Sequence, residues 1–417
     1  MTEIIKDPID FDYSIVKNFI DLNQKEELIN YINQFGLEIK YKKIIPKAEF
    51  ISRWRETESY WDKRQLVRKI LLNSAYGALL NQHCRFWDRR IGQSVTLSGR
   101  QIVKHMMSQI NLAVAGEYNH EGPAIVYGDT DSCYFSAYPI FKKQIENGEL
   151  EWNKDTCIQL YDAIADEAND SFPAFMESAF HCPRKNGEII KAGRELIGDR
   201  SIFITKKRYA INIYDKEGKR KDVNGKMGDI KAMGLDLKRA DTPKYVQEFL
   251  MDVLKMVLSG KTRDDVIEKI KSFKTELGNQ DSWTKGSPKS VNKLTYYGEL
   301  EAKSKTGKAN MPGHVRAALN YNYLRKVNSD NYSMKIVDGM KVIVCKLRGN
   351  PLNFTSIAYP TDELRLPKWF CELPFDDNEM ERTLVDEKIE NLLGVLGWDL
   401  RHSTDTSSTF DELFEFG

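Results

Sequence analysis

Two aspartates separated by one residue form the core of the stretch Tyr127-Gly128-Asp129-Thr130-Asp131-Ser132. Short apolar runs flank them, so residues 124–137 are predicted to form a β-hairpin. Alternation along a strand would place Asp129 and Asp131 on the same side. Two adjacent like charges are costly unless a cation compensates, and Mg²⁺ binds carboxylate and phosphate oxygens together. The pair could therefore hold two ions for phosphoryl transfer. On spacing alone, a solvated Asp-rich turn remains the alternative.

A second group of polar side chains lies in a predicted helix over residues 59–80. Lys69, Asn73 and Tyr76 are spaced to share one helix face, and Gly77 follows the tyrosine. This face offers an ammonium for a triphosphate, an amide, and a ring that can pack against a base. Gly77 would leave room for a base pair beside the ring. An ordinary amphipathic helix with a surface lysine is the alternative.

A third group, Lys206-Lys207-Arg208-Tyr209, lies in residues 202–214, which are predicted to form one strand followed by a turn at Glu217-Gly218. Such a strand carries charge on both faces, which is unfavourable in a core. Phosphate contacts of this kind position a nucleic-acid duplex without reading its sequence. An exposed hairpin strand is the alternative.

Charge is distributed unevenly along a nearly neutral chain. The net charge is +1, yet residues 203–240 contain 11 Lys or Arg and 5 Asp or Glu, whereas residues 376–417 contain 12 acidic and 3 basic residues. A basic stretch in a neutral protein fits a groove for an anionic polymer, although a solvated charged face is the common meaning.

Length and composition are typical of a globular protein with two or three compact units. The 417 residues contain no apolar run of membrane-spanning length, and the N-terminus lacks the features of a signal peptide. The six cysteines are scattered without a C-x-x-C pair, which favours reduced thiols over a zinc site.

Periodicity and capping residues predict the elements that position these groups. Residues 1–58 are expected to be helical and acidic, with breaks near Gly36 and Pro46. Further predicted elements are helices over about 91–115, 242–260, 262–278, from 314 and over 378–396, and a strand over 341–347.

Several motifs in order resemble one family. KILLNSAYGALLN followed by YGDTDS resembles motifs B and C of family B DNA polymerases, in particular the replicative polymerases of T-even-like bacteriophages. The resemblance continues through ITKKRYAINIYDKEG, KAMGLDLKRADTPKYVQ, PGHVRAALNYN, VDGMKVIVCKLRGNP and the C-terminus, and so covers nearly the whole chain.

The resemblance implies an α+β fold with the right-hand architecture of polymerases. It has an antiparallel-sheet palm, helical fingers and a mostly helical thumb. The implied regions are 1–81, the C-terminal half of the fingers; 82–234, the C-terminal portion of the palm; 235–402, the thumb; and 403–417, a flexible tail.

The resemblance also implies a role for each matched residue in DNA synthesis. Asp131 would ligate two catalytic Mg²⁺ ions, which Mn²⁺ could replace, while Asp129 would lie close by and tune the site. Lys69 would hold the triphosphate of the incoming dNTP. Residues lining the nascent base pair would be Asn73, Tyr76 and Gly77.

Primer–template DNA would be held by Lys206, Lys207, Arg208 and Tyr209, with Lys207 also near the active site. Asp215 would help to orient this segment. Glu195 resembles a palm glutamate near the metals, although the surrounding segment is shorter than in the family.

The C-terminal segment resembles the peptide with which these phage polymerases dock on the ring-shaped sliding clamp. Its expected anchors are Phe410, Leu413, Phe414 and Phe416. Exposed aromatic side chains in an acidic tail favour a partner that covers them. The alternative is a tail that folds back on the thumb.

Two features of the family are missing from the 417 residues. There is no D-x-x-S-L-Y-P segment with the second metal-binding aspartate, and there are no exonuclease carboxylate motifs. A naturally split polymerase, a truncated fragment and a degenerate protein are the three explanations. We favour the split, with an N-terminal partner subunit that carries motif A and the exonuclease, acting in the cytoplasm of an infected bacterium. Phe19, Ile20, Leu28 and Ile32 are expected to contact this partner.

Two other function classes compete with this interpretation. A non-catalytic module that binds DNA and the clamp predicts loss of the Asp131 carboxylate or the Lys69 ammonium, and both are present. Another palm-fold enzyme, such as a reverse transcriptase or a nucleotidyl cyclase, is disfavoured by KKRYA and by the Tyr-Gly pair.

Overall fold

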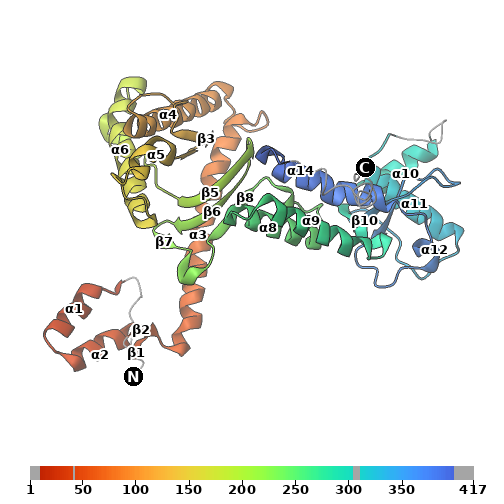
Figure 1. The fold of residues 1–417 in the computed structure, drawn as a ribbon, viewed down its shortest axis with the longest axis horizontal. Coiled ribbons are helices and arrows are strands. Elements are labelled where there is room, and N and C mark those ends of the chain that lie inside the picture. Colours follow the sequence, from red (N-terminus) through yellow and green to blue (C-terminus); the bar gives the residue numbers. More distant parts are fainter. Residues whose placement is uncertain (1–9, 41–42, 304–309, 399–417) are drawn as a thin grey trace, which may run out of the picture. The chain divides into compact units, whose positions relative to one another are not determined.

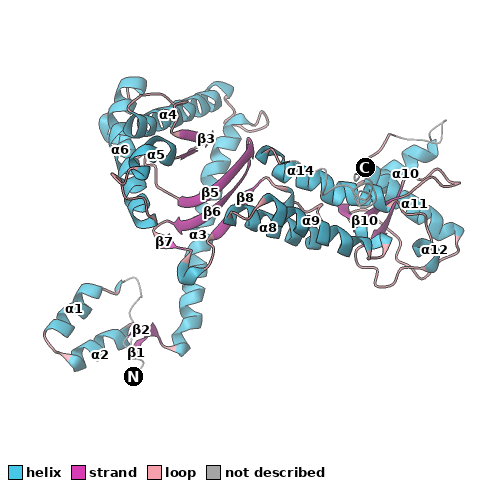
Figure 2. Cartoon of the chain, in the orientation of Figure 1, coloured by secondary structure: helices cyan, strands magenta, loops and turns pink. Residues whose placement is uncertain are grey.

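The computed structural model describes residues 10–40, 43–303 and 310–398. It combines helices with antiparallel sheets, so the predicted α+β class is confirmed (Figure 2). The chain divides after Gln101 into two units, which are described separately. No helix within the described ranges has the length and apolar character needed to span a membrane.

The first unit begins with a small helical core. Helices α1 (Tyr13–Asp21) and α2 (Lys25–Gln34) pack with the hairpin of β1 (Leu37–Lys40) and β2 (Lys43–Pro46). Gly36 joins α2 to β1 with φ +67°, a conformation that glycine adopts without strain. The hairpin differs from the helical prediction for residues 1–58, because neither strand is long enough to show a clear period.

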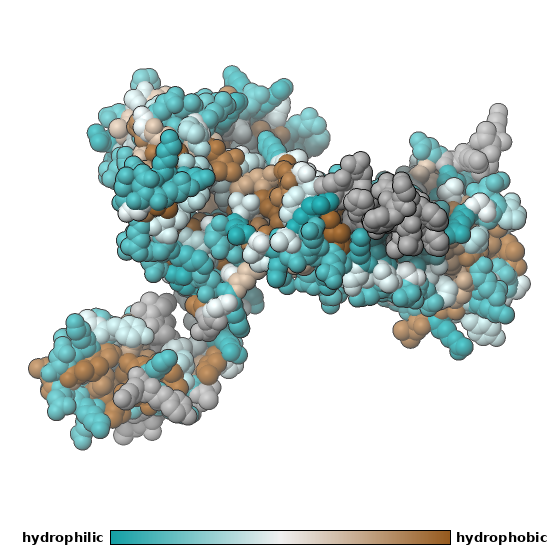
Figure 3. All heavy atoms as spheres, viewed as in Figure 1, coloured by the Kyte–Doolittle hydropathy of each residue, from teal (hydrophilic) through white to brown (hydrophobic). Residues whose placement is uncertain are grey.

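The apolar residues expected to contact a partner take different positions in this core. Leu28 and Ile32 are buried, so the prediction is wrong for these two, and Phe19 is half-buried against them. Ile20 remains 60% exposed. Figure 3 shows hydrophobic atoms on the surface of the α1–α2 segment.

Two long helices follow. Helix α3 (Ala48–Leu80) contains the predicted helix and starts 11 residues before it, and α4 (Arg89–Ala115) agrees with the predicted 91–115 helix. No residue of α3 between Phe50 and Leu80 is buried. The C-terminal end of α4 belongs to the second unit, where Met106, Ile110 and Val114 are core residues.

The second unit continues with the hairpin of β3 (Ile125–Asp129) and β4 (Ser132–Phe135), as predicted. Helices α4 and α6 (Lys154–Phe180) pack around it (Figure 1). Helix α5 (Tyr138–Glu146) lies between β4 and α6 in sequence, and α7 (Arg184–Gly187) follows α6. An antiparallel sheet follows, in which β6 (Arg208–Lys216) pairs with three strands: β5 (Leu196–Thr205), β7 (Lys219–Arg220) and β8 (Asp229–Met233).

Residues 202–214 are not one strand as predicted. The chain turns at Lys206-Lys207 between β5 and β6, and Lys207 adopts φ +64°. Lysine pairs carry no turn signal, so the turn could not be recognised from residue type. The predicted turn at Glu217-Gly218 is present, with both residues at positive φ.

The C-terminal half of the second unit contains two apolar cores. Helices α8 (Lys244–Ser259), α9 (Arg263–Gly278) and α14 (Glu387–Leu393) enclose the first, together with the five-residue π-helical segment Arg382–Asp386. The second core contains α10 (Leu294–Lys303), α11 (Gly313–Val327) and α12 (Lys368–Cys371) beside a sheet of β9 (Ser287–Ser290), β10 (Lys341–Lys346) and β11 (Ser356–Pro360). Helix α13 (Asp377–Glu381) joins the two cores.

Candidate functional site

The hairpin turn holds the two predicted metal-site aspartates. Asp129 is the last residue of β3, and Thr130 and Asp131 form the turn, with Thr130 at φ +53°. The Asp131 backbone N–H donates to the Asp129 carbonyl at 2.6 Å. Strand alternation ends at Asp129, so the argument that put the two acids on one strand face does not hold for Asp131.

The two carboxylates have different surroundings. The Asp131 side chain is exposed and has no hydrogen-bond or ion-pair partner among the residues described. Asp129 is less exposed, and its Oδ2 lies 3.8 Å from Lys207 Nζ. Its Oδ1 accepts a hydrogen bond from Thr130 Oγ1 at 3.1 Å. One acid is therefore free to bind a cation, and the other is already paired with an ammonium.

The turn at Lys206-Lys207 contacts the aspartate hairpin. The Lys207 backbone N–H donates to the Tyr127 hydroxyl at 2.8 Å. Together with the Lys207–Asp129 ion pair, this bond joins two hairpins that lie about 80 residues apart in sequence. Sequence reasoning did not single out Tyr127. Its place two residues before Asp129 on β3 is the only signal that could have identified it.

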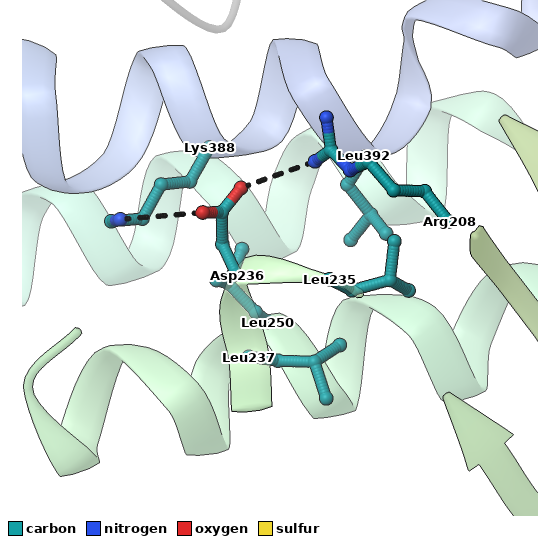
Figure 4. A pocket seen from close by; sticks show the side chains of 7 residues that line it. All are labelled: Arg208, Leu235, Asp236, Leu237, Leu250, Lys388 and Leu392. Atoms are coloured by element: carbon teal, nitrogen blue, oxygen red, sulfur yellow. Dashed lines mark hydrogen bonds and ion pairs between the residues drawn. The ribbon is translucent and has the colours of Figure 1, made fainter. Parts of the chain in front are cut away.

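Arg208 and Tyr209 are held by contacts inside the protein. Arg208 Nη2 lies 3.4 Å from Asp236 Oδ2, and Lys388 of α14 lies 3.9 Å from the other oxygen of the same carboxylate (Figure 4). Tyr209 is buried, and its hydroxyl lies 3.0 Å from the Tyr134 hydroxyl. Burial raises the pKa of Tyr209 well above its usual value. Lys206 and Lys207 are thus the exposed cations of the predicted DNA-binding segment.

Asp215 lies in the interior beside an arginine. Its side chain is 2% exposed, Arg194 Nη1 is 2.5 Å from its Oδ1, and the Gly218 N–H donates to the same oxygen at 3.1 Å. Arg194 also pairs with Asp162 of α6. The contact of Asp215 with DNA stays a prediction, and its visible role is to fix the β6–β7 turn. Glu195 pairs with Lys231 at 3.0 Å.

A cleft of about 510 Å³ lies between the aspartate hairpin and β5. Asp131 and residues 132–136 line one side, and residues 196–201 and Phe203 line the other. Glu195 also lines it. Across the part of the chain that the structure describes, no three His, Cys, Asp or Glu side chains lie close enough to hold a metal ion. Asp131 fits a Mg²⁺ site whose other ligands are water or phosphate, because Mg²⁺ is often bound by only one or two carboxylates.

The predicted nucleotide-binding residues lie on α3 in the first unit. Lys69 and Asn73 are exposed, and the Tyr76 hydroxyl lies 3.0 Å from Thr96 Oγ1 of α4. A Cβ added at Gly77 would meet no atom within 4 Å. The packing of the first unit therefore does not require glycine here. The predicted clamp-binding residues Phe410, Leu413, Phe414 and Phe416 lie outside the described residues.

Comparison with known proteins identifies the family. The sequence model of DNA polymerase family B matches residues 40–145 and 184–362. The DNA-directed DNA polymerases of Enterobacteria phage T4 and Escherichia phage RB69 are each 31% identical, over 73% and 80% of this chain and 33% and 37% of their own length. The DNA polymerase alpha catalytic subunit of Xenopus laevis is 25% identical over 73% of this chain and 18% of its own length.

The chain spans about a third of the length of the two phage relatives. The family match covers the aspartate hairpin, α3 and the turn at Lys206-Lys207, which are the segments that carry the candidate site. The chain therefore belongs to DNA polymerase family B.

Proposed function

We propose that this chain is the C-terminal subunit of a replicative DNA polymerase, which transfers nucleotides from dNTPs to a primer 3′ end. The observation that carries the proposal is the pairing of the two hairpin tips. The Asp131 carboxylate, which has no partner among the described residues, sits beside an Asp129–Lys207 ion pair at a cleft. In a family B polymerase, this arrangement suits metal binding by one acid and primer contact by the neighbouring lysine.

The metal roles follow from these surroundings. Asp131 would hold Mg²⁺, or Mn²⁺ in its place, because its oxygens are exposed and unpaired among the described residues. When bound, two such ions supply positive charge to the attacking and leaving oxygens of phosphoryl transfer. Asp129 would tune the site and hold the Lys207 ammonium at the position of the primer end.

Helix α3 would bind the incoming nucleotide. The exposed Lys69 ammonium is suited to the triphosphate, and Asn73 lies one turn away on the same face. Tyr76 is oriented by its bond to Thr96 and would line the nascent base pair. The open space at Gly77 supports the approach of a base pair at that position.

The exposed Lys206 and Lys207 would contact the primer–template backbone, where cations bind phosphates without reading sequence. Arg208, Tyr209 and Asp215 would act mainly by holding this turn, because each is bound to a neighbour inside the protein. A duplex held here would have its primer end close to the aspartate hairpin.

The proposed architecture is a right hand with half of the fingers in 1–81, most of the palm in 82–234, the thumb in 235–402 and a clamp-binding tail in 403–417. The other catalytic aspartate and the 3′–5′ exonuclease would come from an N-terminal subunit. The proposed site of action is the cytoplasm of an infected bacterium.

A non-catalytic module that binds DNA and the clamp is the second candidate. The observation that favours it is the lack of a three-ligand metal cluster within the described residues. It would retain the basic turn and the tail but perform no chemistry.

Primer extension separates the two candidates. The samples are this chain, this chain with the N-terminal subunit, and the same mixture with Asp131→Ala, each with primed DNA, dNTPs and Mg²⁺. We expect extension only from the intact mixture and a loss of about a thousandfold or more for Asp131→Ala, because a metal ligand is removed. Asp166→Ala, an exposed acid on α6 outside the cleft, is the control and should extend normally.

Failure of a confirmed complex to extend the primer would favour the non-catalytic module. Synthesis by this chain alone would contradict the need for a partner.

A further inference from the structure

Asp236 is a nearly buried carboxylate at which basic side chains from distant parts of the second unit meet. Its side chain is 14% exposed. Arg208 Nη2 of β6 lies 3.4 Å from its Oδ2, and Lys388 Nζ of α14 lies 3.9 Å from its Oδ1 (Figure 4). Arg239 Nε, three residues further along the chain, lies 3.7 Å from the same Oδ1. One acid therefore links β6 to α14, two elements that are far apart in sequence.

The segment just before Asp236 packs against the turn between β5 and β6. Gly234 has φ +63°, and a Cβ at this position would overlap the Lys207 carbonyl oxygen. The backbone of Lys207 is thus held on two sides, because the Tyr127 hydroxyl accepts its N–H and Gly234 lies against its carbonyl. Arg208, the next residue, is tied to the same segment by Asp236. The position of Lys207 therefore depends on where this segment lies.

A π-helical turn immediately precedes α14, the helix that carries Lys388. This turn spans Arg382–Asp386. On an α-helix, side chains five residues apart point about 140° away from each other. Hydrogen bonds from residue i to residue i+5 bring such side chains together instead. Glu381 and Asp386 are five residues apart, and both contact the Lys274 ammonium of α9, at 3.1 and 3.0 Å. The shared ammonium therefore requires the π-helical geometry.

The π-helical turn sets the direction in which the side chains of α14 point. A continuous α-helix through the same residues would rotate α14 by about 100° relative to the helix before it. In the observed register, Ile389 and Leu392 face the first core and Lys388 reaches Asp236. The Lys274 side chain is 1% exposed, and a buried ammonium is costly to leave unpaired, so this register is strongly held. π-Helical turns are frequent at functional sites.

We propose that Asp236 is a positioning residue for DNA synthesis. It joins α14 to the turn between β5 and β6 through Lys388 and Arg208, and it thereby holds Lys207 where this lysine contacts the primer end. The inference rests on the proposed function, which assigns the primer contact to Lys207. Asp236 acts through Arg208 and not by touching the DNA. Through this link, the register of α14 contributes to the placement of the primer.

Primer extension by the complex of this full chain with the N-terminal subunit tests the positioning role. Asp236→Asn should raise the KM for primer–template by about fivefold and leave the KM for dNTP unchanged, because Lys69 is untouched. Lys207→Ala should then cost about threefold less in Asp236→Asn than in the wild type, because the lysine is already displaced. A residue that only stabilises the fold would not change the cost of Lys207→Ala. Asp252→Asn, an exposed acid of α8 paired with Lys255, is the matched control and should change neither value.

Lys388 and the Lys207 amide provide two further measurements. Lys388→Met should raise the KM for primer–template by about twofold, and Lys388→Arg, which keeps a cation, should behave as wild type. Hydrogen exchange of the chain alone reports the turn without any catalysis. Asp236→Asn should speed exchange of the Lys207 amide by about tenfold, while amides of α11, which lies in the second core, should not change.

The outcomes separate the positioning role from the proposed function. If the wild-type complex extends primers but Lys207→Ala costs the same in both backgrounds, the positioning role is overturned and the polymerase function stands. Faster exchange at Lys207 in Asp236→Asn, with no extension by the wild-type complex, would support the link to the turn and contradict the function. If Asp236→Asn does not fold, Lys388→Met decides, and unchanged exchange of the Lys207 amide in that variant would overturn the link.

Discussion

Helices α8 and α3 differ in how much of their apolar surface this chain covers. Helix α8 has 16 residues and buries six large apolar side chains against α9 and α14. Helix α3 has 33 residues, and none between Phe50 and Leu80 is buried. Its exposed large apolar residues are Tyr60, Trp61, Leu66, Val67, Ile70, Leu71, Leu72 and Leu80.

The difference in burial between α8 and α3 has a large effect on how much each helix contributes to the free energy of folding. Burying one such side chain contributes about 1.5–3 kcal/mol, and an isolated helix in water is marginally stable without tertiary packing. The α8–α9–α14 core is therefore packed within this chain, while the apolar side chains of α3 remain uncovered by the described residues. Mutations in the α8–α9–α14 core should lower the free energy of unfolding, and mutations on α3 should lower the rate of primer extension.

The largest expected effect concerns the completed core. Leu254→Ala removes a side chain that is 0% exposed in α8 and should lower the free energy of unfolding by about 2–5 kcal/mol. Leu72→Ala, on α3 with 75% exposure, should change it by less than about 0.5 kcal/mol. Urea unfolding of the chain alone measures both. Equal losses would remove the distinction between the two helices.

The next effect concerns nucleotide binding by α3. Lys69→Ala should raise the KM for dNTP in the complex by roughly ten- to a hundredfold, because a charge-assisted contact to phosphate is lost. Lys63→Ala, also exposed on α3, is the matched control and should behave as wild type. Steady-state primer extension gives both values. A similar KM for the two variants would argue against α3 as the triphosphate site.

A smaller effect is expected where the two hairpins meet. Tyr127→Phe removes the hydroxyl that accepts the Lys207 N–H, a bond that contributes about 1 kcal/mol. Primer extension by the complex should slow by about fivefold, and the free energy of unfolding of the chain should fall by no more than about 1 kcal/mol. Tyr118→Phe removes a hydroxyl bonded to His105, away from the cleft, and should not slow extension. A rate unchanged by Tyr127→Phe would mean that this bond does not position the turn.

The smallest effect concerns a paired acid of the C-terminal half. Arg239 and Lys289 hold the pKa of the Asp241 carboxyl well below its usual value, with Arg239 as the main cause. A depressed pKa adds stability above about pH 4 that is lost as pH falls through the folded-state pKa. Asp241→Asn should therefore flatten the loss of stability below pH 4 by about 1 kcal/mol or less.

Thermal unfolding across acidic pH measures this difference. Lys289→Met should produce part of the same flattening, because it removes one of the two cations. A wild-type acid profile unchanged by either substitution would show that this pair contributes nothing to stability.

Local signals in the sequence predicted those elements that local chemistry determines. Helix α9 begins after Thr262 as predicted, where Thr262 and Asp265 form a capping box, and Gly260 ends α8 with φ +83°. Helix α8 begins one residue later than predicted, with Pro243 as its N-cap. The aspartate hairpin formed as predicted because its strands are apolar and its turn is short.

The features that local signals did not predict are determined by contacts between residues far apart in sequence. Lys207 adopts a left-handed conformation that lysine does not favour, and the Tyr127 hydroxyl and Asp129 carboxylate hold it there. These partners lie about 80 residues away in sequence, so no local pattern could reveal the turn. The burial of Asp215 has the same origin, because only the fold brings Arg194 beside it.

Hydrogen exchange along α3 and α8 tests the central claim most directly. In the chain alone, we expect amides in the middle of α3 to exchange rapidly and those of α8 to exchange slowly, because only α8 is packed on a core. Addition of the N-terminal subunit, primer–template and dNTP should slow exchange in α3 and leave α8 unchanged. Equal protection of the two helices in the isolated chain would contradict the account.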